Sequence, residues 1–191
     1  MLTKPVLLGI VLFIITMIVF FIVYYFFGGI HYYDISLKIN SFLLPAIYCI
    51  FAFVSVRSFW KKNGGIQFKE AFKRAFVPMF VGGFFSMLSI FVFLNFVDTE
   101  AKNMLNYQYV QSNRNELDAE YHKARSIMKN ESDKQELDQK YRERLQSFEA
   151  ERTRGKDMFT ANHFAGYFAA ILIFYMLLSL FFGTFFRGRN L

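Results

Sequence analysis

Four long apolar blocks separated by polar segments set the pattern of this 191-residue chain. The blocks span residues 6–27, 39–56, 75–97 and 161–186, and their central parts hold no Asp, Glu, Lys, Arg or His. A helix rises about 1.5 Å per residue, so about 20 residues cross a hydrocarbon layer about 30 Å thick. The pattern therefore predicts an all-α integral membrane protein with four transmembrane helices.

The longest polar stretch, residues 98–160, lies between the third and fourth blocks and holds 12 Lys or Arg against 13 Asp or Glu. Its apolar residues recur at helical spacing, and Ser132 with Gln135 is typical of a capping box that starts a second helix. We predict an antiparallel hairpin of two charged amphipathic helices, and the alternative is a solvated helical linker with no binding role. The predicted interaction face of the hairpin comprises Leu117, Tyr121, Met128, Leu137, Tyr141, Leu145 and Phe148.

Composition supports a membrane protein, because 54% of the residues are hydrophobic and 27 are Phe. The net charge of +7 comes from bases at the ends of the apolar blocks, since the 98–160 stretch is nearly neutral. This distribution is a topology signal, and we expect membrane lipids rather than nucleic acid as partners. Cys49 is the one cysteine, which excludes an intrachain disulfide and a cysteine-based metal cluster.

The segment 57–74, between the second and third blocks, is both basic and amphipathic. Phe68, Phe72 and Phe76 recur every four residues, which is typical of a helix that lies at, or tilts into, a membrane interface. We expect this helix to run into the third span. Bases there attract anionic lipid headgroups by about 1 kcal/mol each, and the alternative is that they only fix orientation. The candidate site for a headgroup or a cytosolic partner comprises Arg57, Trp60, Lys61, Lys62, Lys69, Lys73 and Arg74.

Orientation follows from the excess of Lys and Arg in the short loops. Lys4, segment 57–74, Arg187 and Arg189 lie on one side, so we predict that both termini and this segment are cytoplasmic. Residues 98–160 are then extracytoplasmic, and their twelve bases do not contradict this, because long loops translocate largely regardless of charge. Residues 161–191 form the fourth span and a basic C-terminus.

Small residues mark the faces where helices can approach closely. Gly82, Gly83 and Ser86 form such a face in the third span, and Gly166 with Ala170 forms a second one in the fourth span. Pro78, near the start of the third block, is a candidate kink or restart of that helix.

Candidate chemistry is sparse. The sequence has no phosphate-cradling glycine loop, no His-Glu-x-x-His motif and no nucleophile elbow. Ion-coupled transporters usually keep ionisable residues within their spans, and their absence from the span centres argues against a transporter. The weakest hypothesis is an enzyme that uses His31, Asp34, Asp98 and His163 at the outer interface. We predict no metal and no cofactor.

The chain resembles an uncharacterised family of four-span bacterial inner-membrane proteins, grouped as a domain of unknown function. The resemblance covers nearly the full length and rests on three features: Gly64 to Phe76 (GGIQFKEAFKRAF), Asn95 to Asp98 (NFVD) and the long charged helical loop. It implies a four-helix inner-membrane fold, supplies no catalytic residues, and points to a polyprenyl-phosphate glycosyltransferase as a partner.

Two functional hypotheses remain. The preferred one is a non-enzymatic accessory or scaffold subunit of an inner-membrane complex, with the hairpin as the partner-binding element and the basic segment at headgroups or a cytosolic partner. The alternative is a protein that binds or translocates an anionic lipid such as a polyprenyl phosphate, alongside a glycosyltransferase.

Overall fold

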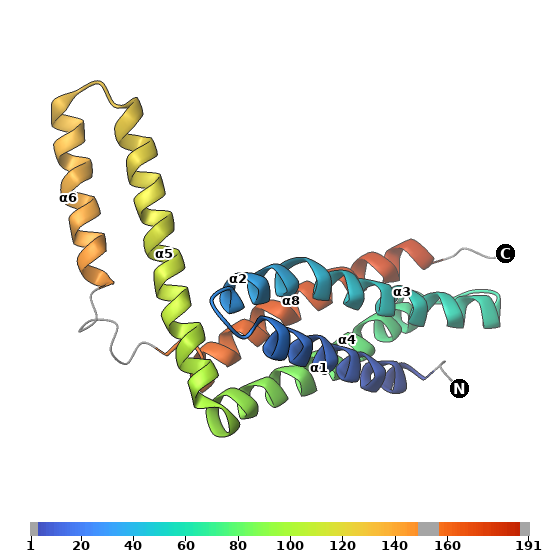
Figure 1. Ribbon diagram of the computed structural model, residues 1–191. Coiled ribbons are helices and arrows are strands. Elements are labelled where there is room, and N and C mark those ends of the chain that lie inside the picture. The colour runs from blue at the N-terminus through green and yellow to red at the C-terminus, as the bar shows by residue number, and fades with distance from the viewer. Residues whose placement is uncertain (1–3, 149–156, 188–191) are drawn as a thin grey trace. The chain divides into compact units, whose positions relative to one another are not determined.

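The fold is all-α, as predicted. The computed structural model describes residues 4–148 and 157–187, and no strand occurs among them. Arg189, one of the bases used to predict the topology, lies outside the described residues. Two short π-helical turns, η1 and η2, join or extend the α-helices. The elements are α1 (Pro5–Phe27), α2 (Tyr32–Lys38), η1 (Ile39–Leu43), α3 (Leu44–Asn63), α4 (Phe68–Val92), η2 (Phe93–Val97), α5 (Thr99–Ile127), α6 (Glu131–Ser147) and α8 (Ala161–Phe186), as Figure 1 shows.

Four helices in the described part of the chain are long and apolar enough to cross a membrane. They are Pro5–Phe27, Tyr32–Asn63, Phe68–Val97 and Ala161–Phe186, with 23, 32, 30 and 26 residues. Large apolar side chains cover their outward faces; Leu177, for example, is 61% exposed. Such a surface suits lipid tails and not water, so the chain is a multi-pass membrane protein.

The chain divides into two compact units. The first unit combines Met1–Asp98 with Phe159–Leu191 and contains all four membrane helices. The second unit is Thr99–Met158 and contains α5 and α6.

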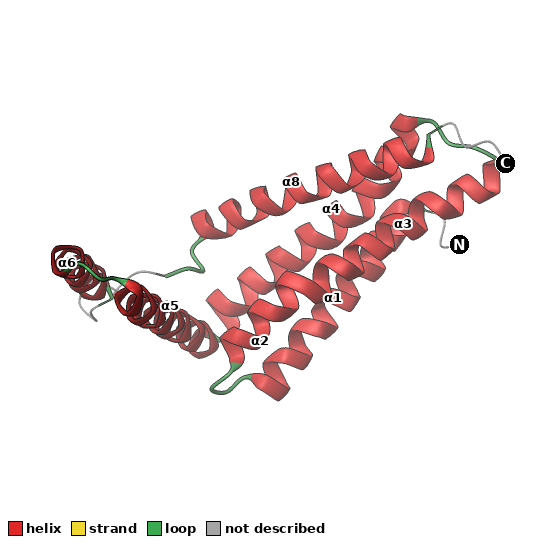
Figure 2. Cartoon of the chain, turned by 90° about the horizontal axis from the view of Figure 1, so that it is seen from above, coloured by secondary structure: helices red, strands yellow, loops and turns green. Residues whose placement is uncertain are grey.

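Helix α4 is the centre of the first unit and packs against α1, α3 and α8 (Figure 2). Two adjacent glycines let its neighbours approach closely. A Cβ atom on Gly82 would lie 2.9 Å from Leu12 Cγ of α1, and one on Gly83 would overlap the hydroxyl of Tyr175 in α8. Ser86, one turn further on, is 2% exposed.

The small residues of α8 pack differently from the prediction. A Cβ atom on Gly166 would meet nothing within 4 Å, and Ala170 is exposed, so the prediction that they form a helix-packing face is wrong. The N-terminal half of α8 instead contacts α4 through Phe164 and Phe168, which pack against Phe91 and Phe84 respectively. Small-residue spacing shows that close approach is possible, but it does not show which side of the helix meets a neighbour.

The second span begins earlier than predicted. The helix that contains it starts at Tyr32 rather than at residue 39, because α2 and η1 run directly into α3. The polar residues that suggested a loop are compatible with a helix, since Asp34 lies in the first turn of α2 and Lys38 in its last turn. A negative charge near the start of a helix and a positive charge near its end both stabilise the helix through interaction with its dipole.

Segment 57–74 is divided between two helices. Its first part ends α3 and its second part begins α4, so the helix that starts at Phe68 runs into the third span. Gly64 ends α3 with a φ of 70°, and α4 then continues from Phe68 through Pro78. A proline inside a helix removes one hydrogen bond. Ring contacts nevertheless run past it, from Phe76 to Phe80, with centroids 5.6 Å apart.

In the second unit, α5 and α6 lie side by side in opposite directions. Tyr121 contacts both Asp138 and Tyr141, and Asp118 also contacts Tyr141, so residues pair around the turn near residue 130. Helix α6 is capped by the Asn130 side chain, which accepts a hydrogen bond from the Ser132 amide. The predicted cap at Ser132 is therefore wrong by two residues, since Asn130 already occupies the capping position.

Candidate functional site

The most regular feature of the second unit is a repeated motif, Glu-Leu-Asp-x-x-Tyr, which occurs once on each helix. The copies are Glu116 to Tyr121 on α5 and Glu136 to Tyr141 on α6. Because the helices are antiparallel, each copy meets the other. The hydroxyl of Tyr121 donates to Asp138 Oδ1 over 2.8 Å, and the hydroxyl of Tyr141 donates to Asp118 Oδ1 over 2.6 Å.

Charge around the two rings strengthens this arrangement. The hydrogen bond to Asp138 raises the pKa of Tyr121, and the hydrogen bond to Asp118 raises the pKa of Tyr141. Arg125 Nη1 donates to the Tyr121 hydroxyl over 2.7 Å, and its Nη2 lies 3.4 Å from Asp138 Oδ2. The two helices are thus held in one register by polar contacts as well as by ring stacking.

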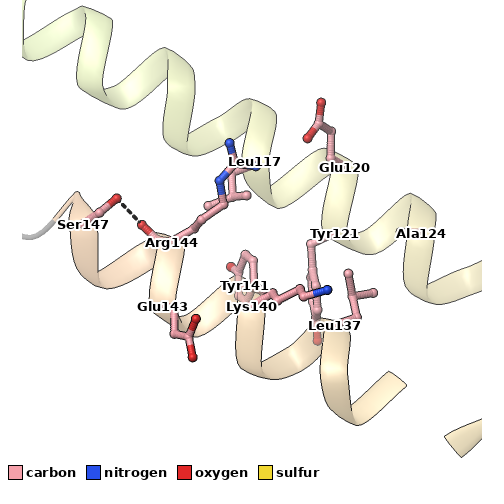
Figure 3. Close-up of a pocket in the computed structure, with 10 residues that line it drawn as sticks. All are labelled: Leu117, Glu120, Tyr121, Ala124, Leu137, Lys140, Tyr141, Glu143, Arg144 and Ser147. Carbon is pink, nitrogen blue, oxygen red and sulfur yellow. Dashed lines mark hydrogen bonds between the residues drawn. The ribbon is translucent and has the colours of Figure 1, made fainter. Parts of the chain in front are cut away.

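A groove of about 520 Å³ runs beside these rings, between α5 and α6 (Figure 3). Its floor is apolar, and both acids and bases line its edges, including Lys140, whose Nζ is 2.6 Å from Glu136 Oε1. The lining residues, which we call the α5–α6 groove, are Leu117, Glu120, Tyr121, Ala124, Leu137, Lys140, Tyr141, Glu143, Arg144 and Ser147.

Only part of the predicted interaction face lines the α5–α6 groove. Leu117, Tyr121, Leu137 and Tyr141 line the groove. Met128, Leu145 and Phe148 are half-buried and do not line it. Tyr121 and Tyr141 stack on each other, so little of their ring surface is left for a partner. The surface available to a partner is therefore smaller than the predicted interaction face.

At one end of the first unit, basic residues from several helices gather. The start of α1, the end of α3, the start of α4 and the end of α8 all lie at this end (Figure 1). Trp60 packs against Phe186 of α8 with ring centroids 6.0 Å apart. We call this set the basic end; its members are Lys4, Arg57, Lys61, Lys62, Lys69, Lys73, Arg74 and Arg187.

Arg74 is held by two neighbouring side chains of the basic end and is 13% exposed. Its Nε donates to Glu70 Oε1 over 2.8 Å, and its guanidinium carbon lies 3.6 Å from the centre of the Phe59 ring. Arg57 is exposed and lies over the Phe53 ring at 5.4 Å from its centre. Lys61, Lys62, Lys69 and Lys73 are exposed as well. The predicted headgroup site is therefore a surface of exposed lysines around one arginine that is held by neighbouring side chains.

Sequence reasoning missed a group of hydroxyls buried between the spans. Thr16 of α1 lies 3.3 Å from the hydroxyl of Tyr48 in α3, and the Tyr48 ring stacks on Tyr175 of α8 with centroids 5.4 Å apart. Buried hydroxyls that bond between helices hold spans together. The available signal was the presence of tyrosines away from the ends of the apolar blocks.

At the opposite end of the first unit, Asp98 is held by the first span. The Tyr24 hydroxyl donates to Asp98 Oδ2 over 2.5 Å, and Asn95 Nδ2 donates to the Phe159 carbonyl over 3.1 Å. His163 lies 2.9 Å from the Thr160 hydroxyl. Among the described residues, no three His, Cys, Asp or Glu side chains are grouped as a metal site needs.

Comparison with known proteins gives one match. The model of a family described as "Protein of unknown function (DUF4199)" matches residues 7–188. No curated protein and no solved structure matches the chain.

Proposed function

The chain belongs to the DUF4199 family, and from its geometry we propose that it is a non-enzymatic accessory or scaffold subunit of a bacterial inner-membrane complex. In this proposal the α5–α6 pair is the partner-binding element. Both termini are cytoplasmic, and residues 98–160 are extracytoplasmic, as the excess of bases at the basic end favours.

The α5–α6 groove carries this proposal. It has an apolar floor and charges of both signs along its edges, which is the surface that an amphipathic helix of a partner fits. The paired tyrosines and their Asp acceptors fix the width of the groove before a partner binds. A preformed site loses less entropy on binding than a flexible one, so a rigid pair suits a scaffold.

Site-specific photocrosslinking in native membranes tests the proposal. A crosslinking amino acid at Ala124, which lines the groove, should capture one specific protein. The same amino acid at Ala119, which is exposed on the same helix but outside the groove, is the matched control and should capture none. Equal yields at the two positions, or no product at either, would contradict partner binding at the groove.

A second candidate function is binding or translocation of an anionic lipid, such as a polyprenyl phosphate, alongside a glycosyltransferase. It is favoured by the basic end, where bases from the ends of four membrane helices gather within one unit. We expect the protein to bind anionic vesicles more tightly than neutral vesicles, with an affinity that falls as salt rises. Indifference to vesicle charge would contradict this candidate.

A further inference from the structure

We propose that a small pocket within the basic end binds a phosphate group, either on a lipid headgroup or as free phosphate. The inference deepens the second candidate function and rests on it. The pocket measures about 210 Å³, which is smaller than a typical pocket for a drug-sized ligand. Its lining comes from three helices and consists of Lys4, Pro5, Phe59, Lys62, Asn63 and Arg74.

Three cations converge on this pocket from three different elements. Lys4 precedes α1, Lys62 lies in the last turn of α3, and Arg74 lies in the second turn of α4. The positive-inside rule explains why bases lie on this side of the membrane. It does not require that three of them line one pocket. Like charges repel there, and Glu70 pairs with Arg74 but with neither lysine.

The start of α1 adds to the positive potential. Lys4 is its N-cap residue and forms no side-chain cap hydrogen bond, and the first turn contains no acid. The N-terminal end of a helix carries a partial positive charge, so a lysine there is unfavourable unless an anion lies nearby. Within residues 4–148 and 157–187, neither Lys4 nor Lys62 forms an ion pair with an acid.

Arg74 supplies the fixed part of the pocket. Its side chain is 13% exposed and is held between Glu70 and the face of Phe59. An arginine fork matches the oxygens of a phosphate, and it binds with less loss of entropy when it is already held in place. Two exposed lysines around one held arginine can contact a phosphate group from several sides.

Binding of short-chain lipids to the full-length protein in detergent tests the pocket. The probes are dioctanoyl phosphatidic acid, which carries a phosphate monoester, and inorganic phosphate. We expect saturable binding of phosphatidic acid, weakened about fivefold by Lys62→Gln and by Lys4→Gln. The control is Lys38→Gln, which removes an equal charge from the exposed end of α2, outside the basic end, and should change affinity less than about twofold.

Each outcome decides between specific and diffuse attraction. If inorganic phosphate competes with phosphatidic acid at similar concentration, the pocket binds free phosphate. If the lipid binds and phosphate does not compete, the pocket binds the lipid headgroup. Equal losses for Lys38→Gln and Lys62→Gln would overturn the pocket while leaving anionic-lipid binding intact. Absence of saturable binding by either probe also overturns it, and vesicle binding then decides the second candidate function separately.

Discussion

Tyr121 of α5 and Tyr141 of α6 stack across the second unit, with ring centroids 4.0 Å apart and an interplanar angle of 18°. Each hydroxyl donates to the Asp that lies three residues before the other tyrosine. The ring contact and both hydrogen bonds therefore require one register, and sliding one helix along the other breaks all three together.

Replacing one ring should loosen both helices. We expect Tyr141→Ala to raise amide hydrogen exchange in α5 and α6 together, because the stack and one cross-helix bond disappear. Tyr141→Phe keeps the stack and should have a smaller effect. The measurement is hydrogen exchange with mass spectrometry on the full-length protein. Arg142→Ala, at the adjacent exposed position, is the control, and an equal rise in that variant would contradict the prediction.

The same pair predicts a response to high pH. Hydrogen bonds to carboxylates raise the pKa of Tyr121 and of Tyr141 above the ordinary value of 10.0. A raised pKa means that folding favours the protonated hydroxyl, so this stabilisation is complete below pH 10.0 and is lost as pH rises through the raised value. We expect exchange in α5 and α6 to accelerate above pH 10.0 beyond the intrinsic rate. The variant with phenylalanine at both positions should lack this excess; an unchanged excess there would assign it to other groups.

The sequence predicted where the membrane helices lie because apolar length is a strong signal. The first block, 6–27, differs by one residue from α1, and the fourth block matches α8. The start of the second helix was missed because hydropathy marks only the apolar part of a helix. The helix itself can extend beyond that part into polar residues. Asp34 and Lys38 interrupt the apolar pattern without interrupting the helix.

Contacts between helices were harder to predict, because spacing does not show which faces meet. Gly83 and Gly166 occupy similar small-residue patterns, but only Gly83 lies against another helix. The two Glu-Leu-Asp-x-x-Tyr copies could have been found as a repeat. Their reciprocal hydrogen bonds follow only once the helices are known to be antiparallel and in this register.

This contrast gives a prediction on stability. Gly83→Ala places a methyl group against the Tyr175 hydroxyl, and overpacking of this kind typically costs about 1–3 kcal/mol. Gly166→Ala meets open space and should be neutral or slightly stabilising, because alanine is the better helix former. Unfolding of both variants in the same detergent provides the comparison. Equal destabilisation would show that Gly166 also packs against a neighbour.

The buried hydroxyls predict a measurable coupling between spans. Thr16 and Tyr48 lie on different helices with their hydroxyl oxygens 3.3 Å apart. A double-mutant cycle with Thr16→Val and Tyr48→Phe should give a coupling of about 0.6 kcal/mol, the usual size for such bonds within membranes. Thr184→Val replaces Thr16→Val in the control cycle, because Thr184 is exposed and bonds to the Leu180 carbonyl of its own helix. Similar coupling in both cycles would contradict a direct interaction.

Topology decides which compartment each proposed partner occupies, and single cysteines can measure it. Replacing Cys49 by alanine removes the native thiol, after which Ser132→Cys marks α6 and Gln67→Cys marks the residue before α4. Both positions are exposed, so labelling depends on compartment rather than on burial. A membrane-impermeant maleimide should label Ser132→Cys in intact spheroplasts and Gln67→Cys only after lysis. The reverse pattern would place the α5–α6 groove in the cytoplasm and the basic end outside. The partner of the groove would then have to be cytoplasmic, and the partner of the basic end extracytoplasmic.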